Sequence, residues 1–232
     1  MDLLYFLKER LDFILKLYDS AVSPFEGTIR KIREGEPPYV DTRDPEYADG
    51  PAFLEEYQEA DDSVMVIGHW CLCMVQASLQ AYLRECIGPL GSLWWNPEAL
   101  QAELSRKQGK TWFGRYRLLF LDLGIDWEEG PVLLSDLEQL NLTRDDLTHN
   151  IDMMSFNVER VQNHAKRFPR GLFTDELWQE FSVDRIKVDR EKLALAIRLV
   201  SAFCAWLDEI RRTYPRYIKG LTPAEPELGP AP

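Results

Sequence analysis

The fold depends most on the stretch VMVIGHWCLCMVQASLQAYL, residues 64–83, which contains no Asp, Glu, Lys or Arg. It continues a helical pattern that starts near residue 52 and ends near residue 87, before Gly88 and Pro89. A helix that is apolar on all sides belongs in the interior of a protein rather than at its surface. We therefore expect a long helix over residues 52–87 at the centre of a helical bundle, and we expect no membrane span.

Outward from this stretch, apolar residues recur every three or four positions, which predicts further amphipathic helices. They cover residues 2–33, 98–106, 111–123, 133–166 and 189–213. Charged residues interrupt the first helix at helical spacing, so it is not a signal peptide, and Pro24 is expected to bend or break it. Period-two alternation is rare. We predict an all-α bundle of four to five main helices, a single domain over residues 1–221, with an acidic loop at 35–50 and an irregular insertion at 167–188. Residues 222–232, rich in proline, are expected to be a disordered tail.

Charge and cysteine content limit the kinds of binding site that this chain is expected to carry. The net charge is -12, so any contact with nucleic acid has to use a local basic patch. The four cysteines form no Cys-x-x-Cys pair and are expected to be reduced thiols in a cytoplasmic protein. His69 and Cys73 share a helix face but lack a second ligand pair, so we interpret both as core residues. We predict no metal site and no cofactor.

One stretch combines basic and aromatic side chains densely enough to bind RNA. Its cations are Arg106, Lys107, Lys110, Arg115 and Arg117. Trp112, Phe113 and Tyr116 lie among them, and such a mixture can hold a phosphate backbone and stack a base. The alternative is a solvated helix face with its aromatic rings in the core.

The segment from Leu142 to Asn150 is the strongest candidate site. Leu137, Leu140 and Leu147 form one apolar stripe of the predicted helix, and Arg144 occupies the missing place in it. A charged residue there needs a partner or a function. If the helix does not break at Thr143, Arg144 and His149 are about 140° apart and do not readily hold one phosphate alone.

The opposite face of this predicted helix carries a second, partly apolar patch. It consists of Leu142, His149, Met153 and Phe156. We expect it to be covered by more of the same chain or by a second subunit, with Leu142, Met153 and Phe156 as interface residues. Asp145 and Asp152 lie within one turn of His149, so their carboxylates are expected to hold the imidazole and raise its pKa.

The arrangement Arg144-Asp145-x-x-x-His149 resembles the Arg-x4-6-His signature of the HEPN superfamily. The resemblance covers the bundle and implies dimers whose motifs face each other, and in active members a metal-independent endoribonuclease of toxin or defence systems. It implies that Arg144 binds the phosphate, that His149 transfers protons and that Asp145 orients them. One subgroup carries a tyrosine two places after the histidine, where this chain has Ile151, so regulation by modification there is not supported.

Two functions follow from these features. The first is a homodimeric endoribonuclease with Arg144 and His149 of two chains lining one cleft, acting on RNA and controlled by an antitoxin or defence-system partner. The second is a non-catalytic HEPN-like module that binds a protein partner or a nucleotide, with Arg144 in a structural ion pair. In a third interpretation, Arg144 and His149 only satisfy one another or nearby acids.

Overall fold

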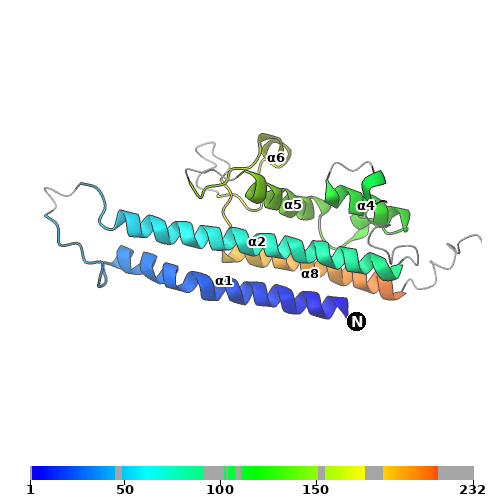
Figure 1. Ribbon diagram of the computed structural model, residues 1–232, viewed down its shortest axis with the longest axis horizontal. Coiled ribbons are helices and arrows are strands. Elements are labelled where there is room, and N and C mark those ends of the chain that lie inside the picture. The colour runs from blue at the N-terminus through cyan, green and yellow to red at the C-terminus, as the bar shows by residue number, and fades with distance from the viewer. Residues whose placement is uncertain are drawn as a thin grey trace, which may run out of the picture.

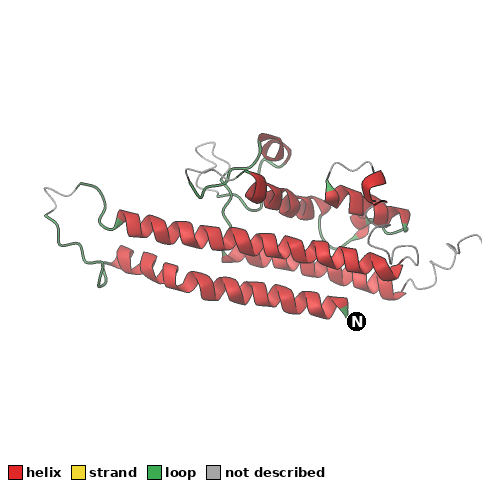
Figure 2. Ribbon diagram, viewed as in Figure 1, coloured by secondary structure: helices red, strands yellow, loops and turns green. Residues whose placement is uncertain are grey.

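The computed structural model describes residues 2–44, 49–90, 102, 104–107, 111–150, 155–175 and 185–213, except the side chains of residues 88–90. These residues form an all-α fold, as predicted, and contain no strand (Figure 2). The helices are α1 (Leu3–Glu34), α2 (Leu54–Leu90), α4 (Trp112–Asp122), η1 (Trp127–Glu129), α5 (Leu134–His149), α6 (Gln162–Arg167) and α8 (Arg190–Thr213).

Three long helices, α1, α2 and α8, lie side by side and form the main body of the protein (Figure 1). On α1 the apolar residues at every third or fourth position face inward and are almost fully buried: Leu7, Leu11, Ile14, Tyr18 and Val22. On α8 the predicted stripe is buried too, including Leu193, Val200, Cys204 and Leu207. The uncharged half of α2 lies between its neighbours, which confirms its central position.

The ends of α1 follow ordinary capping chemistry. The Asp2 carboxylate accepts a hydrogen bond from the Tyr5 backbone N–H at 3.0 Å, and Gly35 ends the helix in the left-handed conformation at φ 64°. The helix continues through Pro24 without a break. Its single missing N–H is tolerated because tertiary packing of the buried face stabilises the whole helix.

By length and composition, α2 is also the one described helix apolar enough to cross a membrane. Its best 18-residue window has a mean hydropathy of 1.4, and half of that window is buried within the bundle. Helices at the centre of a bundle have this same composition. In this fold α2 contacts α1, α5 and α8.

A smaller layer consists of α4, α5 and α6 and lies on the side of α2 opposite to α1 (Figure 1). Trp127 anchors one end of it, because its buried ring packs against Phe113, Phe120 and Phe203 at 5.1–5.3 Å between ring centroids. Thr111 caps α4 by accepting a hydrogen bond from the Gly114 N–H at 3.1 Å. This layer holds the candidate site.

One predicted element is wrong in extent. The helical periodicity predicts a helix over residues 133–166, but α5 ends at His149 and the next described helix, α6, begins only at Gln162. Asn150 ends α5 with a non-helical backbone, and its side-chain amide bonds back to Asp146 at 3.0 Å. Residues 155–161 are not helical, so Val158 and Val161 do not continue the apolar stripe of α5.

Candidate functional site

Helix α5 is covered on two sides, and both covers belong to the same chain. On one side Gln76 of α2 donates a side-chain hydrogen bond to buried Asn141 at 3.3 Å. On the other side the Leu172 backbone N–H donates to the Gln139 side chain at 3.1 Å. Buried polar groups need such partners. These contacts fix α5 firmly and leave its C-terminal end at the surface.

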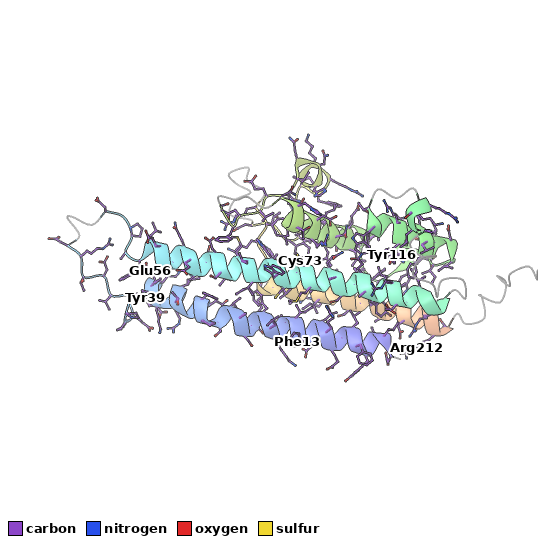
Figure 3. The ribbon with its side chains drawn as sticks, in the orientation of Figure 1. Phe13, Tyr39, Glu56, Cys73, Tyr116 and Arg212 are labelled. Carbon is purple, nitrogen blue, oxygen red and sulfur yellow. The ribbon has the colours of Figure 1, made fainter. Side chains whose placement is uncertain are left out.

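Arg144 and Asp145 form an ion pair at this end of α5. Their side chains are 3.0 Å apart and about a third exposed, at 35% and 30%. They lie close enough to Cys73 of α2 for both charges to act on its thiol, and Figure 3 shows Cys73 on the side of α2 that faces α5. Burial raises the pKa of the Cys73 thiol, while the charges of Arg144 and Asp145 act on it in opposite directions. The charged residue in the apolar seam therefore has a carboxylate partner next to it in sequence.

His149 is exposed at the last position of α5. Thr143 is buried inside an uninterrupted helix, so α5 does not break there. Arg144 and His149 are therefore about 140° apart around one helix and point to different sides of it. Within one chain, these two side chains do not converge on a single phosphate.

The structure reveals a different histidine that is held by a carboxylate. His164 of α6 lies with Nδ1 2.9 Å from Oδ2 of Asp146, and Asn150 bonds the other carboxylate oxygen. The Asp146 side chain is only 1% exposed. Burial raises the pKa of Asp146, against the lowering effects of His164 and of the Val161 backbone N–H.

The sequence predicts that the carboxylates of Asp145 and Asp152 hold the His149 imidazole, and the structure gives Asp145 another partner. The Asp145 carboxylate pairs with Arg144, and Asp152 lies outside the described residues. Sequence reasoning missed Asp146 and His164 because they are 18 positions apart, beyond the reach of helical spacing.

The basic stretch lies at the other end of α5 and is paired with acids. Lys107 forms an ion pair with Asp122, and Arg117 forms one with Glu128. Arg106 and Arg115 also interact with other residues of the chain, and Lys110 is outside the described residues. Arg117 shares a groove with Leu134 and Ser135 at the start of α5. Because α5 is roughly 24 Å long, this stretch is far from His149.

The three predicted interface residues differ in accessibility. Leu142 is buried by the chain itself, and Met153 lies outside the described residues. Phe156 is 63% exposed and lines a groove with Phe25, Val66 and the acidic residues Glu59 and Asp62. Of the three, Phe156 is the side chain for which the structure shows an accessible surface.

His69 is a core residue, as predicted. It is 7% exposed, and its Nε2 lies 3.3 Å from the backbone oxygen of Ile186. Cys73 is half-buried on the same helix. Among the described residues, no three His, Cys, Asp or Glu side chains gather in a way that would hold a metal ion.

Comparisons with protein-family models, with curated proteins and with solved structures give no match to this chain. The resemblance to HEPN proteins therefore rests on the Arg144–His149 motif and on the helical frame around it.

Proposed function

We propose that this chain is a HEPN-type, metal-independent endoribonuclease whose acid–base groups are His149 and His164 at the C-terminal end of α5. The observation that carries the proposal is the contact of 2.9 Å between His164 and the buried Asp146 carboxylate. An imidazole held in this way has a fixed orientation and tautomer. A second imidazole, that of His149, follows Asp146 by one helix turn.

The two histidines flank the same carboxylate. Residues three apart on a helix have Cβ atoms about 5–6 Å from each other, so His149 begins next to Asp146. His164 approaches Asp146 from α6, and about a quarter of its side chain is exposed. In the proposed site, both rings act on one phosphodiester at the surface.

The chemistry follows from the orientation of His164. Its Nδ1–H donates to Asp146, which leaves Nε2 free to accept a proton from the RNA 2′-hydroxyl. The 2′-oxygen then attacks phosphorus, the bond to the 5′-oxygen breaks, and protonated His149 gives its proton to that oxygen. The products are a 2′,3′-cyclic phosphate and a 5′-hydroxyl end. Activity should show a bell-shaped pH dependence, because one imidazole has to be neutral and the other charged.

Arg144 has two conceivable roles in this scheme. Within one chain it lies on the α2 side of α5 and would bind a phosphate next to the one that is cleaved. In the arrangement that the HEPN resemblance implies, Arg144 of a second copy would complete the cleft around His149. Mixing Arg144→Ala chains with His149→Ala chains distinguishes the two, because only a shared cleft regains activity in the mixture.

The second candidate is a non-catalytic module that binds a protein partner. The ion pair between Arg144 and Asp145, the acids paired with the basic stretch and the net charge of -12 all favour it. The groove beside Phe156, with its mixed apolar and acidic lining, offers a surface for such a partner.

The decisive experiment is cleavage of structured and unstructured RNA in EDTA. We expect His149→Ala and His164→Ala each to lower the cleavage rate by about 100-fold or more, the usual contribution of a general acid or base. Arg198→Ala, an exposed change on α8, is the matched control and should cleave like the wild type. Thermal melts establish that each variant is folded. If wild-type protein cleaves no RNA, or all variants cleave equally, the non-catalytic module is the better account.

A further inference from the structure

Helix α1 has a second apolar face that points away from the bundle. Its inner face is buried against α2 and α8, yet Phe6, Phe13 and Leu17 are 57%, 60% and 39% exposed. Figure 3 shows Phe13 projecting from the side of α1 that faces away from the other helices. Large apolar side chains gathered on a surface usually mark a contact with another molecule.

These three side chains form one stripe. At 100° per residue, Phe6, Phe13 and Leu17 lie within about 40° of one another around the helix. The stripe extends over about three turns, with the exposed Tyr5 beside its start. A face that is repeated in this way fits the side of another helix better than it fits a small ligand.

Two residues of opposite charge lie beside the stripe, at positions where they face each other when two copies of the stripe pack antiparallel. Glu9 and Lys16 lie on the same edge, seven residues apart, and Lys16 at present pairs with Asp12 of its own helix. In an antiparallel pair related by a two-fold axis, the same edge of each helix meets its own copy. An axis between residues 12 and 13 brings Glu9 of each chain against Lys16 of the other.

We propose that two copies of this chain associate through α1, antiparallel, about a two-fold axis near residues 12 and 13. In this register Leu17 of one copy fits between Phe6 and Arg10 of the other, and the two Phe13 rings meet near the axis. Two Glu9–Lys16 pairs close one edge. The contact buries apolar surface on both chains and repeats each interaction twice.

The proposal is independent of the proposed ribonuclease activity. Helices α1 and α5 lie on opposite sides of α2 (Figure 1), so a dimer through α1 leaves His149 and His164 open to solvent. It also differs from the interface that the sequence predicts around Leu142, Met153 and Phe156. A contact between two single helices is smaller than a standard interface, so we expect a reversible dimer that forms at micromolar concentrations.

The test is sedimentation equilibrium of the full chain over a wide concentration range. We expect wild type to dimerise and Phe13→Glu to raise the dissociation constant by about 30-fold or more, as for a central aromatic residue of an interface. Trp70→Glu is the matched control, because Trp70 on α2 is 70% exposed and lies outside the stripe. It should leave the dimer unchanged.

Charge exchange tests the register. Glu9→Lys and Lys16→Glu each place like charges together twice and should weaken the dimer about 3- to 10-fold. The double variant Glu9→Lys with Lys16→Glu should restore the wild-type constant. If the double variant does not recover the wild-type dissociation constant, the antiparallel register is wrong. A wild type that stays monomeric at all concentrations overturns the dimer.

Discussion

We expect Gly68→Ala to lower the free energy of unfolding by about 2–3 kcal/mol, near the upper end of the usual cost of overpacking. Gly68 lies where α2 crosses the segment that leads into α8. A Cβ atom at this position would be 2.0 Å from the backbone oxygen of Val188 and 3.1 Å from its carbonyl carbon. Backbone atoms cannot rotate aside as a side chain can, so the segment or the helix has to move. The gain in helix propensity, about 1 kcal/mol, is smaller than this cost.

Urea or thermal unfolding of the two proteins measures the effect, and Gly27→Ala is the matched control. Gly27 lies inside α1, and nothing lies within 4 Å of the Cβ it would gain. That substitution should stabilise the protein by about 0.5–1 kcal/mol, because alanine favours a helix over the unfolded chain. Equal effects of the two substitutions would mean that α2 and residue 188 are not in close contact.

The consequences of Gly68 could not be predicted from the sequence, although the helix around it could. The absence of charge over residues 64–83 was enough to predict a central helix, because a helix with a solvated face usually carries charged residues on that face. The same pattern does not indicate which backbone segment packs against this helix at Gly68. Val188 is far away in the chain, and only the folded structure brings the two together.

The candidate site shows the same division. Helical spacing drew attention to the end of α5, since the charge of Arg144 interrupts an apolar stripe there. It predicted the wrong extent for the helix, because the pattern of apolar residues continues after Asn150 while the backbone does not. The contact of His164 with Asp146 depends on that change of direction. Helical periodicity therefore indicated which polar residues lie near the end of α5, but not which of their side chains contact each other.

The ion pairs of the basic stretch could not be predicted from the sequence either. Lys107 and Arg117 read as candidate RNA-binding cations, yet each has a carboxylate partner 15 or 11 positions further along. Such pairs join a helix to the turns around it, and their formation depends on how those turns fold. An acidic chain has many carboxylates that compete for each cation.

The second large effect concerns His69 and pH. Burial lowers the pKa of His69 from 6.5 to about 4, and the nearby charge of Arg185 acts in the same direction, against the hydrogen bond to Ile186. The folded state thus favours the neutral imidazole more than the unfolded state does. His69 contributes stability that is fully present above pH 6.5 and is lost as the pH falls towards 4. The difference in pKa corresponds to about 3 kcal/mol.

We expect the free energy of unfolding to fall by about this amount between pH 7 and pH 4, in addition to any change from carboxylates. His69→Gln isolates the contribution, because the glutamine amide can still donate to the Ile186 oxygen but does not titrate. The variant should lose stability less steeply with acid, so that the difference in free energy of unfolding between the two proteins changes by about 3 kcal/mol between pH 7 and pH 4. The carboxylates are the same in both proteins, so the difference between the curves reports the imidazole alone. Parallel curves would show that His69 is solvated in the folded state, and the close contact of α2 with residues 185–188 would then be wrong as well.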